Sequence, residues 1–253
     1  MSLAGVVLAA GFGTRLRPLT TLRPKALCPV NTVPLLEHAL DRLTPHADDG
    51  AVAVNAHYHA EQVVSAVDGR AHVQVEEPEA LGTAGAVGLL RTWLDGRDVL
   101  LTNADSYLPG GLDELVEGWD GERCRLLVRP VDGAGDFEGY DYVGACVMPW
   151  SLVRDLRPEV SGLYEVLWRA EHEAGRLELL TATGTAIDCG TPADYLHANL
   201  QASGGSSVVG RGAVVEGSVE RSVVWDGAWV GPEESLRDSI RAGTREHPMT
   251  VRA

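Results

Sequence analysis

Lysine is almost absent from this sequence. Of its 21 lysine and arginine residues, 20 are arginine and one, Lys25, is lysine. A guanidinium is a rigid planar fork of donors, whereas an ammonium is a compact point charge on a flexible stem, so the two are not interchangeable. Chance survival of one surface lysine is one explanation. Lys25 follows a glycine-rich stretch at residues 9–16, and this position favours a retained ammonium beside a phosphate-binding loop.

Two other absences limit the class of protein. A net charge of −15 argues against the broad basic surface of a nucleic-acid-binding protein. No apolar run approaches the ~20 residues that cross a membrane as a helix, and we see no signal peptide. We therefore expect no nucleic-acid partner, no membrane association and a cytoplasmic location. The 253 residues, 45% of them hydrophobic, suffice for one large domain, with or without a small appendage.

Cysteine is scarce and scattered. The four cysteines form no C-x-x-C pair, so we expect no structural zinc site. Three of them lie in or beside apolar, strand-like segments, where a free thiol behaves as a small hydrophobic group. This usage fits a reducing compartment and agrees with the expected cytoplasmic location.

Short apolar runs alternate with segments of helical periodicity. This alternation predicts an α/β fold with a doubly wound, mostly parallel, Rossmann-like sheet. Ligands of such sheets bind at the carboxyl ends of the strands, where both the glycine-rich stretch and Asp105 are expected. Strands are predicted at residues 3–9, 51–56, 73–75, 98–105, 123–129, 142–147 and 187–188. Helices are predicted at residues 34–43, 61–67, 84–94 and 163–174, and from Pro192, with Thr191 as the N-cap.

The composition changes at residues 203–207, a glycine- and serine-rich linker. We therefore divide the chain into a main domain at 1–202 and a tail at 203–253. Val224, Val230 and Leu236 are six residues apart, an imperfect hexapeptide repeat that predicts a short left-handed β-helix-like tail. An ordinary β-meander is the alternative. Such a small stack needs a partner surface to cover its ends, and a homo-oligomer formed through the tail would provide one.

The glycine-rich stretch fits neither of two common phosphate-binding motifs. No Gly-Lys-Ser/Thr closes it, as a Walker A motif requires, and Leu16 stands where the dinucleotide-binding fingerprint needs its last glycine. Glycines nevertheless let the backbone approach a phosphate closely and direct N–H groups at it. Arg15 and Arg17 add positive charge nearby. Taken alone, such a loop is a weak signal.

Four blocks taken together are far more specific. They are residues 8–20 continued by Arg23-Pro24-Lys25, then residues 81–86, 103–105 and 188–195. In this order they resemble the signature of the sugar-1-phosphate nucleotidylyltransferases (the NTP_transferase family), and the resemblance covers about residues 3–200. The tail also resembles one that many members carry. The resemblance implies that residues 1–202 are a catalytic domain that joins an NTP and a sugar 1-phosphate into an NDP-sugar, with Mg²⁺ as cofactor and pyrophosphate as the second product.

The resemblance also implies a role for each matched residue. Lys25 would lie between the phosphates of the two substrates, and Arg15 would neutralise the departing pyrophosphate. Asp105, the third catalytic residue, would hold Mg²⁺ together with Asp188, since magnesium prefers oxygen ligands and retains water. The nucleotide would contact Leu8, Ala9, Ala10, Gly11, Gly13, Thr14, Arg15, Lys25, Leu81, Gly82, Thr83 and Asn103. The sugar phosphate would contact Lys25, Asp136, Gly144 and Glu165.

The sequence departs from the family at the sugar phosphate. Many relatives hold it with a second lysine, which this chain cannot have because Lys25 is its only one. We expect an arginine such as Arg129, or the metal alone, to replace it. Residues 135–137 resemble N-acetylmuramate-1-phosphate uridylyltransferases, whereas residues 76–86 are closer to mannose-1-phosphate guanylyltransferases. The base and the sugar therefore stay open.

Two other functions remain as alternatives. The chain could be a catalytically silent regulatory subunit that binds NDP-sugars, although such a subunit would be free to lose Arg15, Lys25, Asp105 and Asp188, and all four are present. It could also be a nucleotidylyltransferase that acts on a non-sugar phosphate, such as a cyclitol phosphate or phosphocholine.

Overall fold

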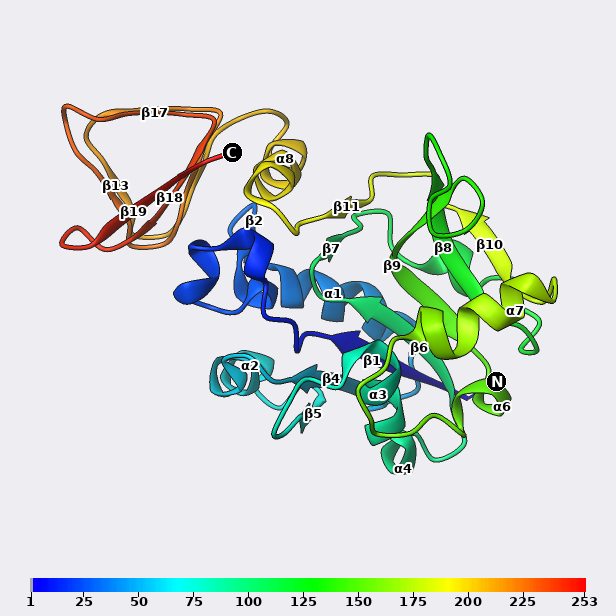
Figure 1. Cartoon of the computed structure of the whole chain (residues 1–253). Coiled ribbons are helices and arrows are strands. Elements are labelled where there is room, and N and C mark those ends of the chain that lie inside the picture. The colour runs from blue at the N-terminus through cyan, green and yellow to red at the C-terminus, as the bar shows by residue number, and fades with distance from the viewer. Residues whose placement is uncertain (1) are drawn as a thin grey trace.

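The computed structural model describes residues 2–253, and its centre is a seven-stranded sheet (Figure 1). The strands lie in the order β10-β8-β9-β6-β1-β4-β5. Only β9 runs against its neighbours, β6 and β8, so the expected mostly parallel sheet is confirmed. The strand bounds are Leu3–Leu8 (β1), Val52–Ala56 (β4), His72–Val75 (β5), Asp98–Asn103 (β6), Arg125–Pro130 (β8), Tyr140–Met148 (β9) and Glu178–Thr181 (β10).

Residues of β1 alternate between two hydrophobic clusters. Leu3 and Val7 pack in a cluster with α1 and α2, while Ala4 and Val6 pack in another with α3 and α4. Successive side chains of a strand point to opposite faces, so helices cover both faces of the sheet and the fold is doubly wound. The helix bounds are Leu35–Leu43 (α1), Ala60–Val67 (α2), Gly82–Leu89 (α3), Arg91–Leu94 (α4), Asp113–Val116 (α5), Trp150–Val153 (α6), Arg169–Glu173 (α7) and Pro192–Ala202 (α8).

Two of the predicted helices differ from their predicted form. The helix predicted at 84–94 is interrupted at Leu90 and forms α3 and α4. The helix predicted at 163–174 begins as a π-helical segment, Tyr164–Trp168 (η5), and continues as α7. The edge strand β10 was not predicted. Single 3₁₀ turns occupy Thr14–Leu16 (η1), Leu19–Thr21 (η2), Lys25–Leu27 (η3) and Thr44–His46 (η4). Within residues 2–253, no helix combines the length and the apolar character needed to cross a membrane.

The register of the sheet brings three strand ends together. Leu8, at the end of β1, is paired with both Asn55 of β4 and Asn103 of β6. The segments that follow these strands therefore start side by side. A small antiparallel ladder joins β7 (Ser106–Tyr107) to β11 (Ile187–Asp188) and pairs Ser106 with Asp188. It brings Asp188 beside Asp105, although the two are far apart in the chain.

Beyond α8 the chain forms a coil of short strands that is triangular in Figure 1. Successive coils stack as three parallel ladders, β12-β15-β18, β13-β16 and β14-β17, and β19 pairs antiparallel with β18. Val224, Val230 and Leu236 lie on β15, β16 and β17 and are buried in one cluster. The six-residue spacing thus places one apolar side chain on each side of the coil.

The parallel pairing shows that the alternative β-meander is wrong, because neighbouring strands of a meander pair antiparallel. The left-handedness of the coil stays a prediction. The remaining strand bounds are Pro29–Val30 (β2), Val33–Pro34 (β3), Val208–Val209 (β12), Val214–Val215 (β13), Ser218–Glu220 (β14), Val223–Val224 (β15), Trp229–Val230 (β16), Ser235–Arg237 (β17), Ser239–Gly243 (β18) and Pro248–Arg252 (β19).

The tail packs on α8 and on the segment that carries Lys25. Thr191 Oγ1 accepts a hydrogen bond from the Asp194 backbone N–H (3.2 Å), which confirms the predicted N-cap of α8. The side chain of Trp225, 1% exposed, donates through Nε1 to the hydroxyl of Tyr195 (3.0 Å). The guanidinium of Arg23 lies 4.4 Å from the centre of the Trp225 ring. Trp225 therefore joins the tail to the main domain.

Removal of the Trp225 ring is expected to destabilise the whole chain. The Trp225→Ala variant should lower the free energy of unfolding by about 3–5 kcal/mol, the usual cost of truncating a large buried aromatic side chain. Urea unfolding followed by far-UV circular dichroism measures it. Trp229→Ala is the matched control, because Trp229 is a half-buried tryptophan of the same tail, and its loss should cost clearly less. Equal losses for the two variants would contradict the docking role.

Candidate active site

The glycine-rich loop follows β1 and turns back toward the edge of the sheet. Gly13 has a φ of 59°, and a Cβ atom at this position would lie 2.8 Å from Cγ2 of Thr20. Glycine is therefore the residue that fits here without strain. Thr20 Oγ1 donates a hydrogen bond to the Gly13 carbonyl (3.0 Å) and holds the turn in place.

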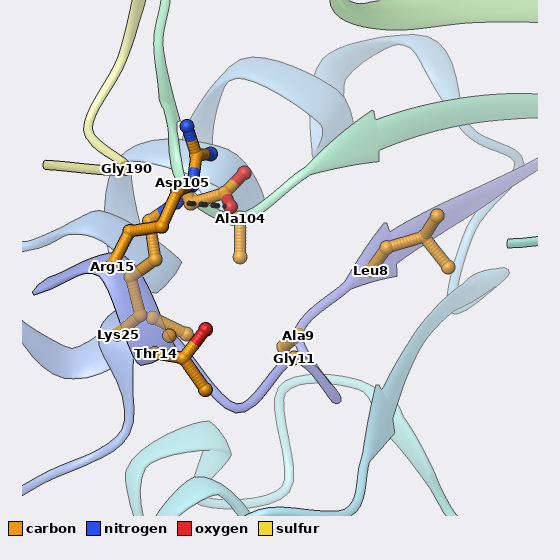
Figure 2. A pocket seen from close by; sticks show the side chains of 11 residues that line it. Leu8, Ala9, Gly11, Thr14, Arg15, Lys25, Ala104, Asp105 and Gly190 are labelled. Carbon is orange, nitrogen blue, oxygen red and sulfur yellow. Dashed lines mark hydrogen bonds and ion pairs between the residues drawn. The ribbon is translucent and has the colours of Figure 1, made fainter. Parts of the chain in front are cut away.

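Four charged residues from separate parts of the sequence meet beside this loop. Lys25 Nζ lies 2.6 Å from Asp105 Oδ2 and 3.1 Å from Asp188 Oδ1. Arg15 Nη2 lies 3.0 Å from the other oxygen of Asp188. Figure 2 shows the Lys25 and Asp105 side chains directed toward one another. The residues singled out as catalytic or metal-binding from the sequence are thus one cluster in the structure.

The pKa shifts of Lys25 and Asp188 favour the charged form of each side chain. Burial acts to lower the pKa of Lys25, but the carboxylates of Asp105 and Asp188 outweigh it and raise this pKa above its usual value. Burial likewise acts to raise the pKa of Asp188, and the attraction of Lys25 and Arg15 outweighs it and lowers that pKa. The Lys25 side chain is only 9% exposed, and an ammonium is costly to bury unless it is paired. Two carboxylates provide the pairing.

Three adjoining cavities open around Asp105. The first cavity lies along the glycine-rich loop, and its lining includes Ala9, Gly11, Gly13, Thr14, Arg15 and Lys25. The second cavity lies toward β4, and its lining includes Ala10, Asn55, Ala80, Gly82, Thr83 and Asn103. The third cavity lies toward β9, and its lining includes Arg15, Ser106, Arg129, Tyr142, Gly144 and Asp188. Asp105 lines all three, and Leu8 lines the first two.

Three of the residues singled out from the sequence lie outside these linings. The Leu81 backbone N–H donates to Glu76 Oε2 (2.7 Å), and Asp136 Oδ2 accepts from the Tyr142 backbone N–H (3.0 Å). Glu165 lies against Gly162, where a Cβ atom would come within 2.0 Å of its carboxylate. The roles assigned to Leu81, Asp136 and Glu165 stay predictions.

Two polar residues beside the site were not expected from the sequence. Asn55 lines the second cavity. Arg42 is 8% exposed; its Nη2 donates to Thr102 Oγ1 (2.9 Å) and to the Asn103 carbonyl (2.8 Å), just before Asp105. Both interrupt otherwise apolar patterns, Asn55 in a buried strand and Arg42 on the apolar face of α1. This interruption is the sequence feature that could have marked them as candidate site residues.

Asp105 and Asp188 fit the ligand preference of magnesium. Within residues 2–253, no group of three or more His, Cys, Asp and Glu side chains is arranged to hold a metal. Mg²⁺ does not require such a group, because it is commonly bound by one or two carboxylates together with substrate phosphates and water. The two carboxylates already converge on one cation, the ammonium of Lys25. They can therefore converge on a metal in the same way.

Fold and site together define a class: an α/β protein with a glycine-rich loop and a cluster of paired charges at the carboxyl edge of its sheet. Comparison with known proteins agrees. Residues 4–126 match the family model described as "Nucleotidyl transferase". This match covers just under half of the chain, and the curated relatives below are named as nucleotidyltransferases of sugar 1-phosphates or as bifunctional relatives.

The chain is 35% identical over 145 residues to N-acetylmuramate alpha-1-phosphate uridylyltransferase of Caulobacter vibrioides, an alignment that covers 51% of this chain and 60% of that protein. It is 24% identical to the bifunctional protein GlmU of Methanococcus maripaludis over 77% of this chain and 53% of that protein. The chain thus spans only about half to three fifths of these two relatives. Probable mannose-1-phosphate guanylyltransferase 2 of Arabidopsis thaliana is 26% identical over 97% of this chain and 80% of its own length.

A solved structure shares nearly the whole fold. It is described as mannose-1-phosphate geranyltransferase from Thermus thermophilus, with a TM-score of 0.74, 20% identity and coverage of 99% of this chain and 95% of that one. At this identity the likeness shows the fold alone. Because it extends over the tail as well as the main domain, the whole architecture is shared.

Proposed function

We propose that this protein transfers a nucleoside monophosphate from an NTP to a sugar 1-phosphate. An oxygen of the sugar phosphate attacks the α-phosphorus, the bond from the α-phosphorus to the leaving oxygen breaks, and pyrophosphate departs as the NDP-sugar forms. The observation that carries this proposal is the position of Lys25, which lines the first cavity and is held by Asp105 and Asp188 where the three cavities adjoin. A cation there can contact the phosphates of both substrates.

The protein's own residues supply positioning and charge, which account for most of the catalysis in phosphoryl-type transfers. The glycine-rich loop brings backbone N–H groups to the triphosphate, and the second cavity takes the nucleoside. Lys25 draws the two phosphorylated substrates together. Arg15, whose side chain is 64% exposed, lies at the rim and can follow the pyrophosphate as it leaves.

Asp105 and Asp188 would hold Mg²⁺, which when bound would offset the negative charge of the phosphates. Lys25 pairs with both carboxylates in the structure. It must therefore exchange part of this pairing for phosphate oxygens when the substrates bind. The two aspartates thus have two functions: they keep the ammonium charged and buried before binding, and they provide the oxygen ligands afterwards.

The third cavity suits the sugar phosphate. Gly144 lines it with a φ of 93°, and a Cβ atom there would lie 2.0 Å from Ser106 Oγ, so the cavity wall depends on glycine at this position. Arg129 also lines the cavity, and its Nη2 lies 3.9 Å from Asp141 Oδ2, a loose pairing that leaves donors for a ligand. We assign Arg129 the role that the second lysine has in many relatives.

The Arg129→Ala variant is expected to raise the KM for the sugar 1-phosphate about 10- to 100-fold, the loss of a hydrogen bond to a charged group. The KM for the NTP should change little. Steady-state kinetics with each substrate varied in turn measures both values. Arg154→Ala is the matched control, since Arg154 is similarly exposed and loosely paired, with Asp155, and lines none of the three cavities. An unchanged KM for the sugar phosphate would instead favour the metal as its sole partner.

A substrate matrix tests the proposed function directly. The common NTPs are combined with a panel of sugar 1-phosphates, and pyrophosphate release is measured with Mg²⁺ and with excess chelator. UTP with N-acetylmuramate 1-phosphate and GTP with mannose 1-phosphate are the first pairs to test, because the names of two relatives specify them. We expect release in at least one pair and none with chelator. Release with a cyclitol phosphate or phosphocholine alone would support the non-sugar alternative, and NDP-sugar binding without turnover in any pair would support the regulatory subunit.

A further inference from the structure

A fully buried carboxylate lies behind the second cavity. Glu76, which follows β5 directly, is 0% exposed. Its Oε1 accepts a hydrogen bond from Asn55 Nδ2 (2.7 Å), and its Oε2 accepts one from the Leu81 backbone N–H (2.7 Å). A buried carboxylate is among the costlier groups to desolvate, so its presence here calls for an explanation.

The hydrogen bonds continue from Asn55 to the glycine-rich loop. Asn55, itself 3% exposed, accepts through Oδ1 from the Ala9 backbone N–H (2.6 Å). One chain of hydrogen bonds thus runs from Ala9 through the two side chains to Leu81. Its two ends belong to two separate segments that line the second cavity, since Ala10 and Gly82, the next residues along the chain, line that cavity together with Asn55.

The pattern of donors explains why position 76 is a carboxylate. Asn55 uses its one acceptor on Ala9, so it turns its amide donor toward Glu76. Leu81 presents a second donor to the same side chain. Both terminal atoms of the side chain at position 76 must therefore accept a hydrogen bond. The two oxygens of a carboxylate can do so, whereas the nitrogen of a carboxamide cannot. A neutral side chain would be easier to bury, but it would leave one buried donor unpaired.

We propose that Glu76 and Asn55 are positioning residues that fix the spacing between the glycine-rich loop and the Leu81–Gly82 segment, and thereby set the affinity of the second cavity for the nucleoside. This role rests on the proposed function. Neither residue reaches the reacting phosphates in this account. Both act through the backbone of the two segments that line the second cavity, and Asn55 also lines that cavity itself.

A donor–acceptor exchange tests the inference. In Glu76→Gln the new side-chain NH2 group faces either the Asn55 amide or the Leu81 N–H, and two donors cannot form a hydrogen bond. In Asn55→Asp the new carboxylate faces the carboxylate of Glu76, and two acceptors cannot form one either. In the double variant the aspartate accepts from Ala9 and from the new glutamine amide, and the glutamine oxygen accepts from Leu81. Each single change breaks one link of the chain, whereas the double change restores every link with the charge moved to position 55.

The readout is the equilibrium Kd for NTP, measured by calorimetry on the whole chain without the second substrate. Each single variant is expected to bind about tenfold more weakly, the effect of one unmatched buried hydrogen bond, and the double variant should recover to within about threefold of the wild type. The KM for the sugar phosphate should change far less, which separates nucleoside positioning from a general loss of order. Thermal unfolding shows how much of each variant is folded.

Asn199→Asp is the matched control. Asn199 is also a fully buried asparagine, and it donates to the Tyr195 carbonyl (3.0 Å) in α8, away from the second cavity. The Asn199→Asp variant should lower the free energy of unfolding without weakening NTP binding by the folded protein. Single variants at positions 55 and 76 that behave like this control, or a double variant as weak as the single ones, would overturn the positioning role alone. A wild-type protein that binds no NTP would overturn the proposed function as well.

Discussion

The Lys25→Ala variant is expected to release pyrophosphate about a thousandfold more slowly than the wild type, a loss in the range that follows removal of one preorganised charged or hydrogen-bonding group. The ammonium lies between two carboxylates and lines the cavity beside the glycine-rich loop. The sequence has no other lysine that could replace it. Single-turnover measurement of pyrophosphate formation in acid-quenched samples gives the chemical step separately from product release.

The Lys25→Arg variant separates charge from shape. A guanidinium retains the positive charge but presents a longer, planar fork, so it should recover only part of the lost rate. Far-UV circular dichroism must show that both variants are folded, because loss of Lys25 leaves Asp105 and Asp188 facing each other without their shared cation. A folded Lys25→Ala variant that works at the wild-type rate would remove the central residue from the proposed mechanism.

The Asp105→Asn variant is expected to reduce kcat by about 10²–10³-fold, since it removes one full charge from the centre of the site with little change of shape. Asp105 makes the shorter of the two Lys25 ion pairs, at 2.6 Å, and it lines all three cavities. The concentration of Mg²⁺ that gives half-maximal activity should rise at the same time. A magnesium titration of pyrophosphate release measures both quantities.

Two further variants make this result specific. Asp98→Asn is a control on β6, the strand that precedes Asp105, because Asp98 lies at the far end of that strand, where it accepts from the Trp150 backbone N–H. The activity of this variant should stay near that of the wild type. Asp188→Asn combined with Asp105→Asn should cost less than the two single losses multiplied together, since residues that act as one unit are not additive. Fully multiplicative losses would show that the two carboxylates act independently.

The convergence of Arg15, Lys25, Asp105 and Asp188 could be predicted from the sequence. The glycine-rich loop and Asp105 follow buried apolar runs, and the carboxyl ends of parallel strands meet at one edge of a sheet. The resemblance of the four sequence blocks to the family then implied that Lys25 and Asp188 belong to the same site. The six-residue spacing of Val224, Val230 and Leu236 similarly predicted how the tail coils.

The hydrogen bonds of Glu76, the edge strand β10 and the contacts of Trp225 could not be predicted, because each depends on the folded surroundings. Glu76 resembles any glutamate at a strand end until Asn55 and Leu81 are seen around it. The edge strand β10 is only partly buried, so its residues lack the strong apolar pattern of β1 or β6. Trp225 offered no sign of its contacts, because Arg23 and Tyr195 lie far from it in sequence.

The pairing of β7 with β11 has a consequence for how the charged cluster assembles during synthesis of the chain. The stretch that matches the family model ends at residue 126, and by then the glycine-rich loop, Lys25 and Asp105 are all present. Asp188 is made much later and reaches Lys25 through the short ladder between Ser106 and Asp188. Until then the ammonium has only one of its two carboxylate partners. The charge balance around Lys25 is therefore completed only when this late segment folds back.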